Sequence, residues 1–182
     1  MVLSGIGKRY AIALFNAAEA EDVLDQVYGD AASFAKLLQA EVTFRRFLVS
    51  LQVTPDEKKD IVARAIGDRA SGLFVKFVLL LIDKKRINRY EEIEKAFETL
   101  YEQHRGIVEV AIITAIPLDA EMERKARSTI ERRTGKTAKI VKRVDPDVIG
   151  GVIMIAGDKI IDGSIRNRLG EMRRELLELR VR

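Results

Sequence analysis

Residues 144–169 read VDPDVIGGVIMIAGDKIIDGSIRNRL, and this stretch near the end of the chain decides the fold. An Asp-Pro turn and a glycine pair lead into an apolar strand, and a two-residue Gly-Asp turn then predicts a hairpin. An Asp-x-Ser sequence follows as the cap of a terminal helix. No residue here is suited to catalysis, so the stretch predicts a built surface and not an active site. The motif consists of Asp145, Pro146, Gly150, Gly151, Gly157, Asp158, Asp162 and Ser164.

This order of Asp-Pro, Ile-Gly-Gly, Gly-Asp and Asp-x-Ser before a leucine-rich helix resembles the delta subunit of the bacterial F-type ATP synthase. The mitochondrial counterpart in that family is the oligomycin-sensitivity-conferring protein. Residues 10–15 (YAIALF) and 115–118 (AIPL) also look like that family, so the resemblance extends over most of the chain. It implies a connector and not an enzyme.

Composition sets limits on fold and function. The chain has 182 residues, of which 47% are hydrophobic, and this suffices for the core of one large or two small domains. Cysteine is absent and His104 is the one histidine, so we expect no disulfide, thiolate metal site or histidine-based catalytic dyad. The longest uninterrupted apolar run, Phe77–Ile82, is far shorter than the roughly 20 residues of a membrane-spanning helix. Acidic residues follow the first apolar segment without a cleavage site, which favours an amphipathic helix over a secretory leader.

The first hundred residues carry helical periodicity, which predicts about six helices and no strand before Arg105. Thr54-Pro55-Asp56-Glu57 is a strong helix start, because the threonine and glutamate side chains can cap each other's backbone amides. The helix predicted over Gly72–Asp83 is apolar nearly all round and therefore belongs in the centre of a bundle. Two apolar stripes recur at steps of three and four residues: Leu24, Val27, Ala31, Phe34, Leu38 and Tyr90, Ile93, Phe97, Leu100, His104.

The remainder of the chain mixes strands and helices. Gly106 is expected to end the bundle in a left-handed turn. Residues 107–116, 138–144, 148–156 and 159–161 predict strands, while 118–134 and the residues from Ile165 onward predict helices. The fold class is therefore α+β overall, with an all-α six-helix N-terminal bundle over residues 1–105 and a small α+β domain over residues 106–182.

Several sequences imitate cofactor or metal sites without meeting their requirements. Residues 134–137 (TGKT) lack the glycine that a phosphate-binding loop needs at position 130, so a helix cap before a strand is favoured. Gly150 and Gly151 lack the spacing of a dinucleotide site and indicate a bulge or close backbone contact within a strand. The aspartates of the C-terminal domain match no calcium-loop spacing, and each has a turn or capping role available. We therefore expect no cofactor, metal or small-molecule substrate.

The excess positive charge lies in the C-terminal domain. Residues 1–105 hold 16 basic and 16 acidic side chains, whereas residues 106–182 hold 16 and 12. Nine of the basic residues lie within 124–143, which makes an RNA-associated protein the alternative function. No aromatic residue follows Tyr101, so the sheet has no ring on which a base could stack. Many of these charges can also be an ordinary solvated helix face, and the resemblance favours an acidic, helical partner over nucleic acid.

Two apolar elements are candidates for partner binding. Tyr10, Ala13, Leu14 and Ala17 form a ridge on the first helix, and from the sequence this ridge and the helix over 72–83 fit a groove or an internal core equally well. The resemblance implies a groove that binds the N-terminal helix of an ATP synthase alpha subunit, lined also by Val75, Val78, Leu79 and Ile82. The last helix carries a second stripe, which either packs on the sheet or binds the b subunits of the peripheral stalk. This stripe is Leu169, Met172, Leu176 and Leu179.

The resemblance implies a complete function. The chain would be a non-catalytic peripheral-stalk subunit that links the alpha/beta catalytic head to the b subunits, so that the head resists rotor torque during proton-coupled ATP synthesis. It would bind no nucleic acid, and it would be a peripheral membrane protein on the cytoplasmic face of the bacterial inner membrane. A peptide from the start of the alpha subunit is then expected to bind residues 1–105 alone.

Overall fold

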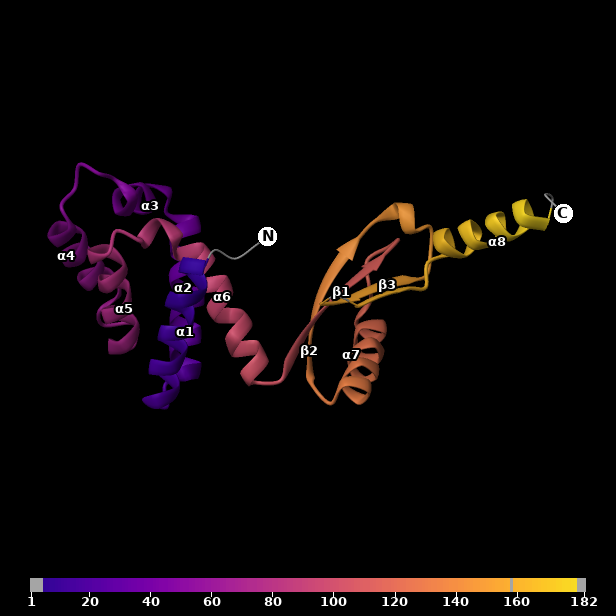
Figure 1. Ribbon diagram of the computed structural model, residues 1–182, viewed down its shortest axis with the longest axis horizontal. Coiled ribbons are helices and arrows are strands. Elements are labelled where there is room, and N and C mark those ends of the chain that lie inside the picture. The colour runs from indigo at the N-terminus through magenta and orange to yellow at the C-terminus, as the bar shows by residue number, and fades with distance from the viewer. Residues whose placement is uncertain (1–4, 158, 180–182) are drawn as a thin grey trace. The chain divides into compact units, whose positions relative to one another are not determined.

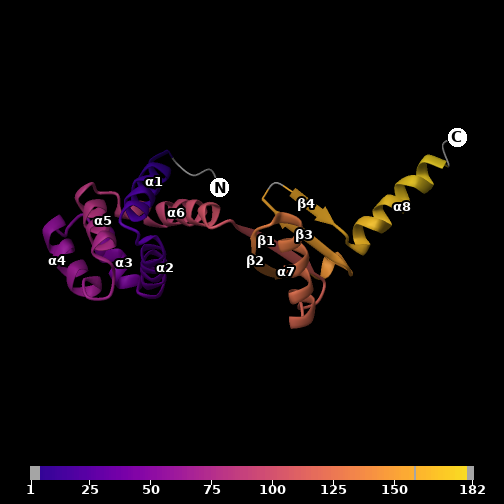
Figure 2. The same ribbon diagram turned by 90° about the horizontal axis from the view of Figure 1, so that it is seen from below.

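The computed structural model describes residues 5–157 and 159–179. The chain divides after His104 into two compact units, an N-terminal unit of helices and a C-terminal unit built on a sheet. Figure 1 shows helices α1 to α6 in the first unit and strands β1 to β3 with helices α7 and α8 in the second, and Figure 2 also labels strand β4. The predicted α+β class is confirmed.

The N-terminal unit contains the six expected α-helices and no strand within its described residues 5–104. A short 3-10 helix, η1, precedes the last of them. The elements are α1 (Gly5–Ala20), α2 (Leu24–Ala40), α3 (Val42–Val49), α4 (Pro55–Ile66), α5 (Gly72–Asp83), η1 (Ile87–Arg89) and α6 (Tyr90–His104).

The core of this unit follows the predicted stripes closely. All five stripe residues of α2 are buried, and Phe34 among them is 2% exposed. Its ring lies 4.9 Å from that of Tyr90 and 5.9 Å from that of Phe74, measured between centroids, with both pairs near edge-to-face. The Tyr90 hydroxyl donates a 2.8 Å hydrogen bond to the carbonyl of Ala31, and burial raises the pKa of this phenol. The α6 stripe becomes accessible toward its end, where His104 lies 3.5 Å from Glu19 at the surface.

The start of α4 confirms the predicted capping box. The Glu57 amide donates to Thr54 Oγ1 at 3.3 Å, and the Thr54 amide donates to Glu57 Oε2 at 2.9 Å. The bond from the Thr54 amide and a 2.8 Å bond from the Thr54 hydroxyl to the same carboxylate oxygen lower the pKa of the Glu57 carboxyl, because both stabilise its charged form. Pro55 occupies the first helical position, where the missing amide hydrogen is not needed.

The C-terminal unit is a four-stranded sheet in the order β2-β1-β3-β4. Strands β1 and β2 are parallel and α7 connects them, while β3 runs antiparallel to both β1 and β4. The elements are β1 (Ile107–Thr114), α7 (Ala120–Thr134), β2 (Thr137–Val144), the 3-10 helix η2 (Pro146–Val148), β3 (Val152–Ala156), β4 (Lys159–Asp162) and α8 (Ile165–Leu179).

Two strands are shorter than predicted. Strand β1 ends at Thr114 and not at residue 116, because the Thr114 hydroxyl donates to the carbonyl of Ile116 at 2.7 Å and closes a turn. Strand β3 begins at Val152, so the prediction that Gly150 and Gly151 lie within a strand is wrong. The alternative part of that prediction, a close backbone contact, is confirmed: a Cβ atom on Gly151 would lie 2.3 Å from the carbonyl oxygen of Gly163.

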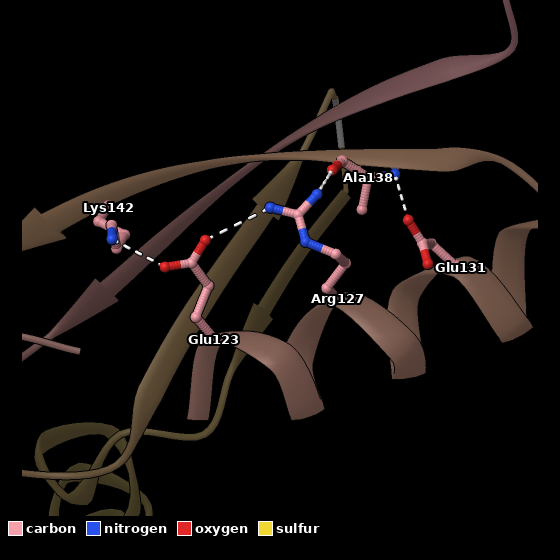
Figure 3. A network of polar contacts seen from close by, with 5 residues as sticks. All are labelled: Glu123, Arg127, Glu131, Ala138 and Lys142. Carbon is pink, nitrogen blue, oxygen red and sulfur yellow. Dashed lines mark hydrogen bonds and ion pairs between the residues drawn. The ribbon is translucent and has the colours of Figure 1, made fainter. Parts of the chain in front are cut away.

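Helix α7 is attached to β2 by a network of polar contacts, called here the α7 clasp (Figure 3). None of the α7 residues is buried. Lys142 on β2 donates to Glu123 at 2.8 Å, and Arg127 lies 3.3 Å from the same carboxylate. Arg127 also donates to the carbonyl of Ala138, whose amide donates to Glu131 at 3.2 Å. Side chains of α7 thus bind both backbone groups of a single β2 residue.

The α7 clasp predicts a dependence of stability on pH. The hydrogen bond and charge of Lys142, followed by those of Arg127, hold the pKa of the Glu123 carboxyl below its ordinary value of 4.5. A carboxyl with a lowered pKa in the folded state stabilises that state above its unfolded pKa and loses this contribution as pH falls through the folded value. We expect Glu123→Gln to lower the thermal midpoint of the C-terminal unit near neutral pH, and the difference from the parent to shrink progressively as pH falls below 4.5.

Thermal denaturation followed by circular dichroism across this pH range measures the effect. Glu121→Gln is the matched control, because Glu121 pairs at 2.7 Å with Lys125 of the same helix and is not part of the clasp. A difference between Glu123→Gln and the parent that stays constant with pH would contradict the assigned role of the carboxylate.

Candidate functional site

The structure places the chemically suggestive residues in structural roles. Within residues 5–157 and 159–179, no group of three or more His, Asp or Glu is positioned to hold a metal ion. Asp145 Oδ1 accepts a hydrogen bond from the amide of Asp147 at 2.9 Å, as a capping aspartate does.

Gly135 ends α7 in a left-handed conformation and β2 starts at Thr137, so the TGKT sequence joins a helix to a strand and not a strand to a helix. No described helix combines the length and the hydropathy that crossing a bilayer requires.

The α1–α5 surface is the first candidate, since these two helices contact each other. The structure divides the eight residues predicted to line it. Leu14, Val78 and Ile82 are 3% exposed or less and belong to the hydrophobic core of this unit. The accessible members, which define the α1–α5 surface, are Tyr10, Ala13, Ala17, Val75 and Leu79.

Some exposed apolar residues of the N-terminal unit lie outside the predicted set. Ile12 and Leu80 are exposed on α1 and α5, and hydrophobic periodicity does not distinguish such a position from a core position on the same helix. A separate hollow of about 350 Å³ lies beside α3 and η1, lined by Leu48, Val49, Ile87 and their neighbours. No periodicity in the sequence predicts this hollow, because its lining comes from helix ends, the loop over residues 50–54 and a 3-10 helix.

The α8 stripe is the second candidate. Leu169, Met172 and Leu176 are 55%, 56% and 66% exposed, so the structure has the stripe open and not packed against the sheet. Figure 2 shows α8 extending away from the strands of its own unit. The side chain of Leu179, the fourth predicted member, lies outside the described part of the chain. The α8 stripe therefore means Ile165, Leu169, Met172 and Leu176, with Ile165 added because it is also exposed and continues the same spacing.

The motif between β3 and α8 fixes where α8 begins. The Ser164 amide donates to Asp162 at 2.9 Å, and the Asn167 amide donates to the Ser164 hydroxyl at 3.1 Å. The bonds to Ser164 lower the pKa of the Asp162 carboxyl. The Ile165 amide donates to the carbonyl of Gly150 at 2.9 Å, which ties the first turn of α8 to the turn before β3. These residues are a clamp at the base of the helix.

The hairpin within this motif agrees with its prediction. Ala156 pairs with Lys159 across a two-residue turn, and Gly157 has a φ of +57°. Asp158, the other turn residue, lies outside the described residues. Pro146 occupies the start of η2, where its fixed φ suits the first turn.

The basic segment 124–143 is partly neutralised by its own unit. Lys125, Arg127 and Lys142 pair with glutamates of α7, and Lys139 lies 3.3 Å from Glu109 of β1. These pairs reduce the charge that is available to a polyanion. The structure therefore adds nothing that favours RNA over a protein partner.

Comparisons with known proteins agree along nearly the whole chain. The family described as OSCP: ATP synthase delta (OSCP) subunit matches residues 6–176. The ATP synthase subunit delta of Syntrophus aciditrophicus (strain SB) is 34% identical over 179 residues, which cover 98% of this chain and 99% of that protein. The subunit delta of Alkaliphilus oremlandii (strain OhILAs) is 33% identical over 176 residues, with 97% and 98% covered.

A solved structure shows the same fold. A chain in the cryo-EM structure of the Toxoplasma gondii mitochondrial ATP synthase hexamer aligns with a TM-score of 0.74 at 24% sequence identity. The alignment covers 96% of this chain and 98% of that one. The resemblance read from the Asp-Pro, Ile-Gly-Gly and Asp-x-Ser motifs is confirmed, and the chain belongs to the ATP synthase delta (OSCP) subunit family.

Proposed function

We propose that this protein is a non-catalytic subunit of the peripheral stalk of an F-type ATP synthase, and that it ties the catalytic head to the b subunits. Membership of the delta family supports the assignment of this chain to an ATP synthase complex. The observation that carries the linking role is an accessible apolar surface on each of two compact units, the α1–α5 surface on one and the α8 stripe on the other. A static tie needs two separate binding surfaces and no turnover of substrate.

The N-terminal unit is the proposed contact with the head. Small residues at Ala13 and Ala17 allow another helix to approach α1 closely, and Tyr10, Val75 and Leu79 supply apolar area around them. The proposed occupant is the N-terminal helix of an alpha subunit. The C-terminal unit is then left for the b subunits, and the protein is held at the cytoplasmic face of the inner membrane through the complex.

The head contact is tested by placing a large charged side chain on the α1–α5 surface. We expect Ala13→Arg in the full chain to weaken binding of a peptide from the alpha subunit's N-terminus by about tenfold or more, because the side chain blocks close approach and adds a charge to an apolar contact. Isothermal titration calorimetry measures the affinity. Ala63→Arg, at an exposed position of α4, is the matched control and should bind as the parent does. Equal affinity of the parent and Ala13→Arg would show that the peptide does not use this surface.

A further inference from the structure

The α8 stripe has the spacing of a coiled-coil seam. Its four residues, Ile165, Leu169, Met172 and Leu176, are separated by four, three and four positions, which is the heptad pattern of helices that pair along their length. A helix packed on a sheet can show the same spacing, but here the stripe is exposed and is not covered by the sheet of its own unit. The clamp at Ser164 and Gly150 holds the first turn in place, so the seam is presented by a helix that is already formed.

The positions that flank this seam carry positive charge. Arg166, Arg168 and Arg173 occupy the two heptad positions that lie beside the seam and face a partner helix. The positive charge of Arg166 also lowers the pKa of the Asp162 carboxyl at the end of β4. Arg168 and Arg173 are exposed and form no ion pair with another described residue. Glu175 takes a further flanking position in the sequence, and its side chain lies outside the described part.

A strained isoleucine lies next to the base of α8. Ile149 has φ +67° and ψ −45°, a conformation that is strained for a β-branched residue. Its side chain is 59% exposed, so burial does not offset this strain. The next residue, Gly150, packs so closely on Ile165 that an added Cβ would lie 2.7 Å from Ile165 Cδ1. Ile149 therefore has an exposed apolar side chain one residue away from the backbone that contacts the first residue of the α8 stripe.

We propose that Ile149 and the α8 stripe together form a docking surface for one partner helix that has apolar residues in heptad spacing and Glu or Asp at its flanking positions. The two helices pair as a coiled coil, with Arg168 and Arg173 facing carboxylates. A second copy of this chain is a poor partner, because a parallel pair would bring Arg168 of one helix against Arg173 of the other. The inference rests on the proposed function to the extent that the b subunits supply the acidic helix.

Two synthetic helical peptides test the charge rule on the full chain. They share the same apolar heptads, and one carries Glu and the other Lys at every flanking position, so that like charges keep each peptide from pairing with itself. We expect the Glu peptide to bind about tenfold more tightly at low salt by fluorescence anisotropy, and the gap to narrow as salt is added. The double variant Arg168→Glu, Arg173→Glu should reverse the preference toward the Lys peptide. Equal binding of the two peptides by the parent protein overturns the proposal.

The strained residue has its own test. Ile149→Gly removes the side chain and permits the same backbone conformation, so we expect an unchanged or higher thermal midpoint together with severalfold weaker binding of the Glu peptide. Ile116→Ala is the control, because Ile116 is also exposed but follows β1, away from the sequence that leads into α8. A lower midpoint for Ile149→Gly would mean that the side chain acts in packing, and would remove it from the docking surface.

Binding of purified b subunits separates this inference from the proposed function. If the parent chain binds them and the double variant binds them equally well, the charged seam is wrong while the stalk role stands. If the parent chain does not bind them at all, the stalk role fails. Light scattering on the full chain gives the last check, because a stable dimer that Leu169→Asp dissolves would show that the seam serves self-association and would overturn the proposal.

Discussion

Gly151→Ala is expected to lower the free energy of unfolding of the C-terminal unit by about 3 kcal/mol or more. Gly151 has a φ of +78°, where an alanine is strained. The new Cβ would also lie 2.3 Å from the carbonyl oxygen of Gly163 and 3.2 Å from Ser164 Cα. These are backbone atoms, and the Gly163 amide is held by a 2.9 Å bond to the carbonyl of Val152, so they cannot give way cheaply.

Urea denaturation of the full chain, followed by circular dichroism, measures this loss. Gly135→Ala is the matched control, because Gly135 has a φ of +66° with no atom within 4 Å of an added Cβ. Its cost should be that of the dihedral angle alone, about 1 kcal/mol. If the two variants lose the same stability, the close approach of Gly151 to Gly163 adds no cost to the substitution. The backbone at the base of α8 can then move to accept a larger residue.

Phe34→Ala is expected to cost the N-terminal unit about 4 kcal/mol, because it removes a buried ring and leaves a cavity that rigid neighbours cannot close. The ring of Phe34 meets those of Phe44, Phe74 and Tyr90, which come from three other parts of the bundle. Loss of this ring should also remove a packing contact of Tyr90, whose hydroxyl donates a hydrogen bond to Ala31 on the helix that carries Phe34. Thermal and urea denaturation report the change.

Leu51→Ala gives the comparison for this loss. Leu51 is 99% exposed, so its truncation should change the free energy of unfolding by about 0.5 kcal/mol or less. A large cost at Leu51, or a small one at Phe34, would contradict the location of the core.

The sequence predicts this fold well wherever a local signal acts alone. The α2 stripe, the Thr54 capping box and the turn at Gly157 each depend on residues a few positions apart, and each is found as predicted. The extent of a strand is less local. Strand β3 starts later than its apolar run suggests, because the residues before it form η2 and a turn in which Ile149 has a positive φ. An isoleucine is not expected in that conformation, so the sequence does not predict this turn.

The candidate surfaces show the limit of periodicity more clearly. A ridge on a helix has the same spacing whether a neighbouring helix or a partner protein covers it, so Leu14 and Ala13 could not be told apart before their burial was known. The contacts of the α7 clasp could not be predicted from the sequence either, because Glu123 and Lys142 are 19 positions apart and meet only through the pairing of β2 with β1.

The α7 clasp has a consequence for how this subunit behaves among other polypeptides. Strand β2 is at the outer edge of the sheet, and such an edge can recruit a strand from another molecule and start aggregation. The Thr137 amide bonds inward to Gly106, whereas both backbone groups of Ala138 are occupied by Arg127 and Glu131. An intruding strand would have to displace these two side chains first. At Ala138 the edge is thereby protected from pairing with a strand of another chain.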